Sequence, residues 1–142
     1  MAFDGSEDSQ KALDYSLGLA EKYSATVLIL NVFQIPTAYP YPGQQISYQE
    51  NVSAFIADLR KSHEAILSKA ASAAKILKPN LKIATALKEG DISSQIISTA
   101  AEESFDLIVL GHRGWSRVRE LFLGSITERV AHLAQCAVLI IK

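Results

Sequence analysis

The sequence predicts an α/β protein: a single domain over residues 1–142, built as an open, doubly wound parallel sheet of five strands in the order 3-2-1-4-5 with helices on both faces. Three observations predict this class. Strand and helix patterns alternate along the whole chain. Most of the strand patterns are continuous apolar runs, as in parallel sheets that are buried on both sides. Hydrophobic residues make up 49% of 142 residues, which is enough to bury a substantial core.

The chain begins with a very short apolar segment at residues 1–3. The turn signal DGS follows at once at residues 4–6, so we expect a first strand that is unusually short or that continues into residues upstream of this sequence. Ser6 can cap a helix, which the apolar spacing predicts over residues 6–22. Residues 25–33 (ATVLILNVF) then predict a buried strand.

The middle of the chain contains a long connection and a long helix. Residues 34–49 hold three of the four prolines and are typical of a loop that forms a lid or a disordered segment. Apolar residues at helical spacing predict a helix over 51–77, which Pro79 ends. His63 lies at the edge of its apolar stripe, where we expect a packed or boundary residue and not a ligand. A strand at 81–87 follows.

The last third of the chain repeats the alternation. Asp91 is predicted to cap a helix that ends near residue 103. Residues 107–110 form a short apolar strand, a helix is expected from residue 125 to about 134, and residues 136–141 form the last strand. The pattern is therefore one of parallel strands with helical crossovers.

The strongest functional signal lies between the strand at 107–110 and the helix that follows it. The connection carries Gly111, Gly114 and Gly124, and residues 125–128 (SITE) are typical of a capping box. Unpaired N–H groups and the positive end of the helix dipole make such a junction an anion site. An ordinary connection with glycine turns is the alternative. Further phosphate donors in the loop are His112, Arg113, Arg117 and Arg119.

The predicted strand order brings two loops together. In such sheets ligands bind beyond the carboxyl ends of the strands, where the strand order reverses. That point lies between the first and fourth strands, so Asp4 would face the glycine loop across a crevice. Asp4 is placed to accept a hydrogen bond from a ribose hydroxyl or to hold a metal ion; the alternative is an Asx-turn residue at the helix start. Val32, at the end of the second strand, would offer backbone groups to a base.

These residues resemble the universal stress protein family over essentially the whole chain. The similarity rests on AFDGS at residues 2–6, on DLIVLG at residues 106–111, and on the glycine pattern Gly111-x2-Gly114-x9-Gly124-Ser125. This last pattern is similar to the signature of the ATP-binding branch of the family. The resemblance implies that ATP binds with Mg²⁺ or Mn²⁺, and that the chain forms a homodimer through its last strand.

The resemblance also implies a role for each matching residue. Asp4 would contact the ribose or the metal ion, and Ala2 and Val32 would lie at the adenine. The residues implied along the phosphates and ribose are Gly111, Arg113, Gly114, Gly124, Ser125 and Ile126.

The bulk composition limits the classes of binding partner and the cellular location that the sequence predicts. Fourteen basic against fifteen acidic residues give a net charge of -1, so no basic field attracts nucleic acid or an anionic membrane. The longest apolar run, residues 26–32, is interrupted by Asn31 and is too short to span a bilayer. The single cysteine, Cys136, and the absence of a visible signal peptide predict a cytoplasmic protein.

Three functions are consistent with these observations. The first is an ATP-binding regulatory protein that acts as a nucleotide-dependent switch. The second is a slow ATPase or an adenylyl- or phosphoryl-transfer enzyme, with Ser125 as the first acceptor to consider. The third is an interaction module of the same fold that binds no nucleotide. Asp4 is the only well-placed carboxylate in the sequence, which favours binding over efficient phosphoryl transfer.

Overall fold

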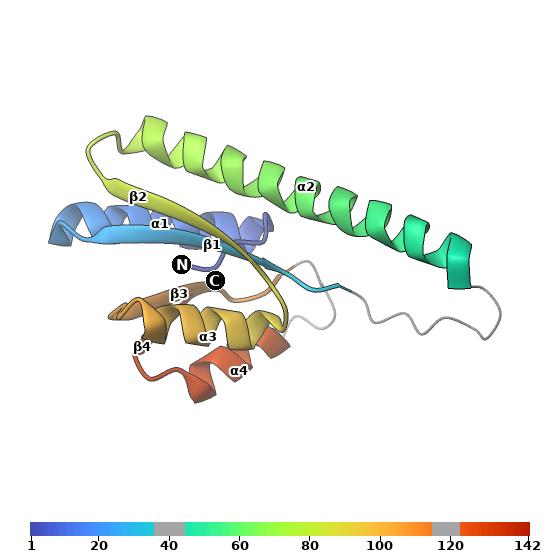
Figure 1. Ribbon diagram of the computed structural model, residues 1–142. Coiled ribbons are helices and arrows are strands. Elements are labelled where there is room, and N and C mark those ends of the chain that lie inside the picture. The colour runs from blue at the N-terminus through green and yellow to red at the C-terminus, as the bar shows by residue number, and fades with distance from the viewer. Residues whose placement is uncertain (36–44, 115–122) are drawn as a thin grey trace.

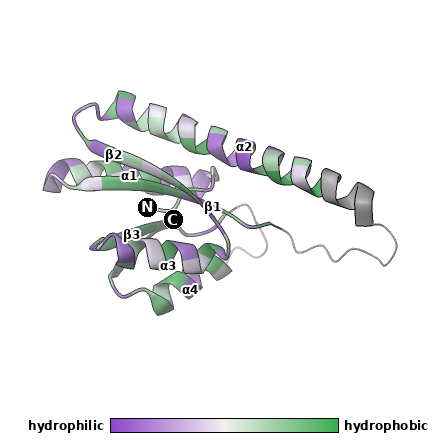
Figure 2. Ribbon diagram, in the orientation of Figure 1, coloured by the Kyte–Doolittle hydropathy of each residue, from purple (hydrophilic) through white to green (hydrophobic). Residues whose placement is uncertain are grey.

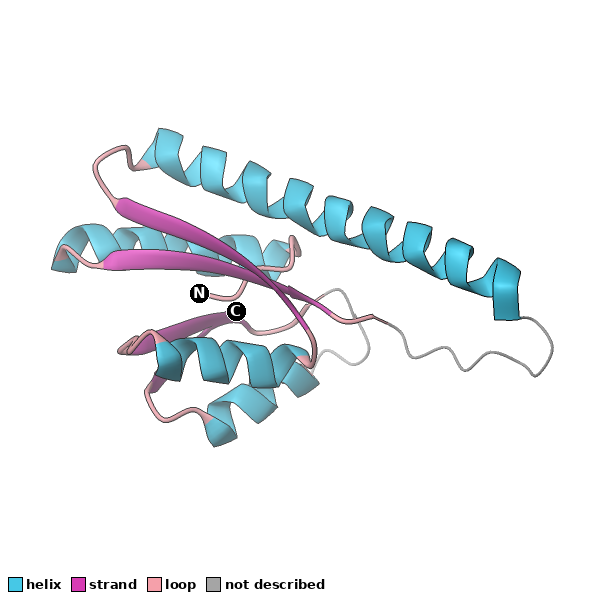
Figure 3. Ribbon diagram, in the orientation of Figure 1, coloured by secondary structure: helices cyan, strands magenta, loops and turns pink. Residues whose placement is uncertain are grey.

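The computed structural model describes residues 1–35, 45–114 and 123–142. These residues form an α/β structure of helices and parallel strands (Figures 1 and 3). The elements in chain order are α1 (Glu7–Tyr23), β1 (Thr26–Phe33), α2 (Gln45–Leu77), β2 (Lys82–Glu89), α3 (Ile92–Glu102), β3 (Leu107–Gly111), α4 (Ser125–Leu133) and β4 (Ala137–Ile141).

The strands form two parallel pairs, and the N-terminal residues lie between them. β1 pairs with β2, and β3 pairs with β4. Ala2 forms a parallel bridge with Leu30 of β1, and its N–H donates to the carbonyl of Val109 in β3 at 3.0 Å. The N–H of Phe3 donates to the carbonyl of Leu30 at 2.8 Å. The predicted first strand is therefore present as a bridge only, and the five-stranded order 3-2-1-4-5 stays a prediction.

Alternate residues of β1 point into two hydrophobic clusters. Val27 and Ile29 pack with residues of α1 and α2, whereas Leu30 and Val32 pack with residues of α3, β3 and α4. Figure 2 shows the hydrophobic residues along β1 and β3, between the helices. This alternation explains why β1 reads as a continuous apolar run: seven of its eight residues are buried, so both faces need apolar side chains.

The predicted helix starts at Ser6 and Asp91 are confirmed. The Ser6 hydroxyl accepts a hydrogen bond from the N–H of Ser9 at 3.2 Å. Asp91 Oδ1 accepts from the Ser94 N–H at 2.9 Å. Hydrogen bonds from the hydroxyl and N–H of Ser94, and then from the Ser93 hydroxyl, lower the pKa of the Asp91 carboxyl to about 2. Each side chain satisfies an N–H group that a helix terminus leaves without an intrahelical partner.

The long helix begins earlier than the sequence predicted. α2 starts at Gln45, so residues 45–49 are helical and not part of a loop. The physical reason is that Pro36, Pro40 and Pro42 all precede this start, and neither proline nor glycine occurs from Gln45 to Leu77. Residues 36–44 of the predicted loop lie outside the described residues. None of the described helices combines the length and apolarity needed to cross a membrane.

Replacing Gly18 by alanine should stabilise the protein. Gly18 lies exposed within α1, and a Cβ atom at this position would have no other atom within 4 Å. Alanine costs less conformational entropy than glycine in a helix, so we expect Gly18→Ala to raise the free energy of unfolding by about 1 kcal/mol. Urea denaturation of the variant and the parent measures the difference. A lower free energy of unfolding in the variant would contradict this view of α1.

Candidate functional site

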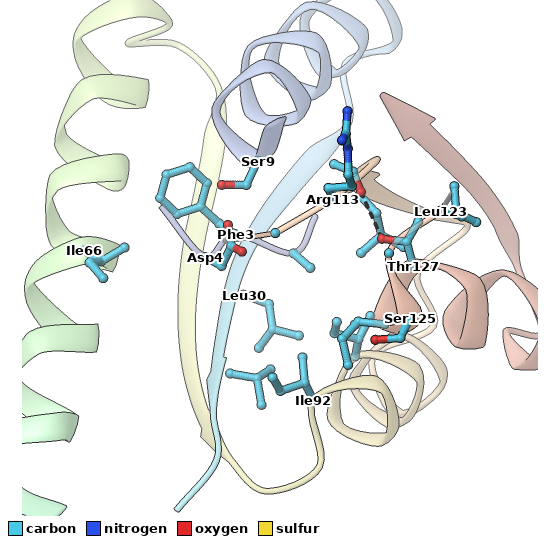
Figure 4. A pocket seen from close by; sticks show the side chains of 18 of the residues that line it. Phe3, Asp4, Ser9, Leu30, Ile66, Ile92, Arg113, Leu123, Ser125 and Thr127 are labelled. Atoms are coloured by element: carbon cyan, nitrogen blue, oxygen red, sulfur yellow. Dashed lines mark hydrogen bonds between the residues drawn. The ribbon is translucent and has the colours of Figure 1, made fainter. Parts of the chain in front are cut away.

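A cavity of about 590 Å³ lies at the carboxyl ends of β1 and β3 (Figure 4). Its volume is within the usual range for small-molecule sites. The structure brings all nine residues predicted for the site to the lining of this one cavity, although their roles in binding stay predictions. These residues are Ala2, Asp4, Val32, Gly111, Arg113, Gly114, Gly124, Ser125 and Ile126.

One wall of the cavity is apolar. Leu30 and Val32 contribute from β1, and Ile92 and Ile96 contribute from α3. Ile126, in the first turn of α4, closes this wall. The side chains belong to, or pack against, the same hydrophobic cluster, so the wall is continuous with the protein core. A surface of this kind suits a flat, largely apolar group such as a nucleobase.

Asp4 touches the glycine loop across the cavity. Its Oδ1 accepts a hydrogen bond from the Ser6 N–H at 2.9 Å, so the Asx-turn interpretation holds for this oxygen. Its Oδ2 lies only 2.6 Å from the point where Gly114 would carry a Cβ atom. Asp4 and Gly114 are 110 residues apart in the sequence, and the predicted approach of the two loops is therefore confirmed.

The structure requires glycine at position 111 but not, by close contact, at position 124. A Cβ atom on Gly111 would lie 2.8 Å from the Asp8 carbonyl carbon and 2.9 Å from the Ser9 nitrogen, so glycine allows β3 to approach the first turn of α1. A Cβ atom on Gly124 would lie 3.4 Å from the nearest atom, the His112 oxygen, which is an ordinary contact. Neither glycine has a positive φ. Glycine is needed at position 111 because β3 closely approaches the backbone of α1, and not because the backbone is left-handed.

The predicted capping box at the start of α4 is wrong. Gly124 is the N-cap residue, and no side chain caps the helix. The helix begins at Ser125, one residue earlier than the predicted box requires, so Ser125 is the first helical residue and not the N-cap. The Thr127 hydroxyl donates to the Gly111 carbonyl at 3.0 Å, which ties the first turn of α4 to the end of β3 (Figure 4). Ser125 is exposed at the cavity instead. The first turn of α4 therefore borders the cavity, and its N–H groups have no intrahelical partner. The N-terminus of the helix is a favourable place for an anion.

The Arg113 side chain belongs to the lining of the cavity, and its predicted role at the phosphates stays a prediction. Figure 4 shows it directed away from the middle of the cavity. Its Nε donates to Nδ1 of the buried His112 at 3.1 Å, which holds the guanidinium to its neighbour. Arg113 therefore lines the cavity without pointing its charge inward. Arg117 and Arg119 lie outside the described residues.

Asp4 is the acidic residue among the described residues that line the cavity. The described part of the chain holds no group of three or more histidine, cysteine or acidic side chains that could bind a metal ion by themselves. Mg²⁺ in nucleotide sites is commonly held by one or two carboxylates together with phosphates and water. The residues present fit a metal ion that enters with a nucleotide, and they do not form a separate metal cage.

A model of the universal stress protein family matches residues 1–142. The chain belongs to the universal stress protein family. Universal stress protein YxiE of Bacillus subtilis (strain 168) is 31% identical over 144 residues, which cover 100% of this chain and 96% of the relative. The structure of hypothetical protein MJ0577 superposes with a TM-score of 0.81 at 21% identity, covering 99% of this chain and 92% of that one.

Two solved relatives contain adenine nucleotides. A universal stress protein in complex with cAMP is 25% identical with a TM-score of 0.67, and the alignment covers 99% of this chain and 92% of that chain. A universal stress protein from Archaeoglobus fulgidus in complex with dAMP shares the fold at 19% identity and a TM-score of 0.60, covering 99% of this chain and 94% of that one.

Sequence reasoning missed His63 at the cavity of this universal stress protein. The histidine packs as predicted, because its ring stacks on Phe33 with centroids 5.4 Å apart, but it also lines the cavity. The sequence feature that could have indicated His63 is Asn31, a polar residue in an otherwise apolar strand, which lies within hydrogen-bond distance of His63. The other lining residues that were missed are Phe3, Ser9, Leu30, Ile66, Ile92, Ile96, Leu110, Leu123 and Thr127.

Proposed function

We propose that this universal stress protein binds ATP, or a closely related adenine nucleotide, and that occupancy of the cavity acts as a switch in a stress response. One observation carries the proposal. The turn with Asp4, the loop with Gly114 and the first turn of α4 border a single cavity that has an apolar wall. The cAMP bound by a relative of the same fold supports an adenine nucleotide as the class of ligand.

The parts of the nucleotide match the parts of the cavity. The adenine would lie against the apolar wall, where Val32 and Ala2 can offer backbone groups. The ribose would lie at Asp4, since a carboxylate accepts hydrogen bonds from hydroxyl groups. The phosphates would lie between Gly114 and Ile126, next to the N-terminus of α4. An Mg²⁺ or Mn²⁺ ion would then be held by the phosphates and water, with Asp4 nearby.

The last strand supports a homodimer as part of the proposal. β4 is AVLII, and among the described strands it pairs with β3 alone. Residues 138–141 stay partly exposed. An apolar strand with an unpaired edge tends to pair with another chain, so we place a second copy along β4, in a cytoplasmic protein.

A second candidate function is slow phosphoryl or adenylyl transfer to Ser125. The observation that favours it is that Ser125 borders the cavity and does not cap α4, so no capping role withholds its hydroxyl from a reaction. Incubation with labelled ATP tests this candidate. Label retained on the protein, and lost in Ser125→Ala, would support an enzyme. Binding of ATP without turnover would support the switch alone.

Thermal unfolding with and without Mg-ATP tests the proposed binding. A ligand at about 100 times its Kd stabilises the folded state by about 2.7 kcal/mol, so the melting temperature should rise by several degrees. Mg-CTP is the matched control, because it carries the same triphosphate on a different base. Equal shifts with both nucleotides would mean that the base is not recognised. No shift with millimolar ATP, ADP or AMP would leave an interaction module as the better description.

A further inference from the structure

The polar residue within β1 forms a buried hydrogen-bond network. Asn31 interrupts the apolar run of the strand and is 1% exposed. Its Nδ2 donates to the Phe3 carbonyl at 2.7 Å, and its Oδ1 lies 2.7 Å from Nδ1 of His63 on α2. The Phe3 carbonyl can only accept, so the amide nitrogen of Asn31 faces Phe3 and the amide oxygen accepts from His63. A buried amide with a partner at both ends is held in one orientation.

The hydrogen bond to Phe3 lies where the N-terminal segment leaves the sheet. The Leu30 N–H donates to the Met1 carbonyl at 2.9 Å, and the Phe3 N–H donates to the Leu30 carbonyl at 2.8 Å. The Phe3 carbonyl comes next along the chain, and the side chain of Asn31 holds it. Asn31 therefore fixes the backbone at the last residue before the turn that carries Asp4.

Asp4 follows Phe3 directly at the cavity (Figure 4). The Phe3 side chain is buried in the hydrophobic cluster that also contains residues of α1 and α2. Asp4 Oδ1 accepts from the Ser6 N–H at 2.9 Å, and Gly5 between them has a φ of 84°, which favours glycine. Asp4 Oδ2 lies 2.6 Å from the point where Gly114 would carry a Cβ atom. The space for the carboxylate on this side is narrow, so a small displacement of the Phe3 backbone would change where the carboxylate lies.

We propose that Asn31 is a positioning residue of the nucleotide site: through the Phe3 carbonyl it holds the turn from which the Asp4 carboxylate binds the ribose hydroxyls. The inference rests on the proposed function, because it needs a ribose at Asp4. Asn31 is not among the described residues that line the cavity, so it acts through Asp4 and not by touching the ligand. Its contribution is geometric, since a hydrogen bond weakens steeply when its length or direction is wrong.

Asn31→Asp tests the proposal with the smallest change of shape. Aspartate keeps an oxygen that accepts from His63, but it has no N–H for the Phe3 carbonyl. Calorimetric titration compares the affinity for Mg-ATP with that for Mg-dideoxy-ATP, which lacks both ribose hydroxyls. We expect the wild-type protein to prefer ATP at least about tenfold, and Asn31→Asp to reduce this preference to within about threefold. A merely structural role would weaken the binding of both nucleotides alike.

Three further variants complete the comparison. Asp4→Ala should abolish the preference, and adding Asn31→Asp to it should lower the preference no further, as expected of residues that act as a unit. Ile29→Val removes a methylene group from the buried core on the same face of β1, and Ile29 is not among the described residues that line the cavity, so this control should keep the preference. Asn31→Val suits a strand, carries no charge and offers no donor to Phe3; it replaces the aspartate variant if that one does not fold.

A preference that is lost in Asn31→Asp and in Asp4→Ala but kept in Ile29→Val supports the inference. If the wild-type protein binds neither nucleotide, the proposed function fails and the inference fails with it. If the wild-type protein binds both nucleotides equally, or if Asp4→Ala keeps the preference, a nucleotide still binds but Asp4 does not hold its ribose, which overturns the inference alone. If Asn31→Asp or Asn31→Val keeps the wild-type preference, Asn31 only stabilises the fold and the inference is wrong.

Discussion

Gly111→Ala is expected to lower the free energy of unfolding by about 2 kcal/mol. The new Cβ atom would lie 2.8 Å from the carbonyl carbon of Asp8, 2.9 Å from its oxygen and 2.9 Å from the Ser9 nitrogen. All three are backbone atoms at the start of α1, and they cannot rotate away as a flexible side chain can. Either β3 or α1 must shift, which disturbs well-packed neighbours. Urea denaturation measures the loss.

Gly18→Ala provides the matched control for this substitution. It makes the same chemical change at a glycine where a Cβ atom meets no other atom within 4 Å. The two variants should therefore move the free energy of unfolding in opposite directions. A Gly111→Ala variant within about 0.5 kcal/mol of the parent would show that β3 and α1 do not lie as close together as described.

Gly114→Val should abolish measurable binding of Mg-ATP while the protein stays folded. Gly114 is exposed, so the variant has room on the solvent side. Towards the cavity, however, its Cβ atom would lie 2.6 Å from Asp4 Oδ2. The branched side chain would displace the Asp4 carboxylate and fill space that the phosphates need. We expect a loss of affinity of more than about hundredfold in calorimetric titration.

The smaller change Gly114→Ala should give an intermediate loss, because it introduces the contact with Asp4 but adds less volume. Circular dichroism of both variants confirms that the fold is kept. If Gly114→Val binds Mg-ATP as the wild-type protein does, the nucleotide lies elsewhere and Asp4 is no part of its site.

Local patterns in the sequence were sufficient for much of the fold. The apolar run of β1, the caps at Ser6 and Asp91 and the helical spacing within α2 each depend on neighbouring residues, so the sequence carries them directly. The approach of Asp4 to Gly114 could also be predicted, since the carboxyl ends of parallel strands meet at one edge.

The remaining features depend on contacts that no local pattern records. SITE at residues 125–128 is typical of a capping box, but Gly124 is the N-cap residue, and the first turn of α4 is tied to β3 by the hydrogen bond from the Thr127 hydroxyl to the Gly111 carbonyl. His63 was predicted to pack, and its place at the cavity follows from Asn31, 32 residues away in the sequence. Gly111 was assigned to the phosphates, which stays a prediction, and the structure adds a packing reason against α1 that the sequence did not show. Each of these outcomes is decided by a tertiary partner.

The crystal structure of the protein grown with Mg-ATP tests the central claim most directly. We expect the adenine against Val32 and Ile96, the ribose within hydrogen-bond distance of Asp4, and the phosphates between Gly114 and Ile126. A nucleotide bound at any other place, or a cavity that stays without nucleotide at saturating ATP, would contradict it.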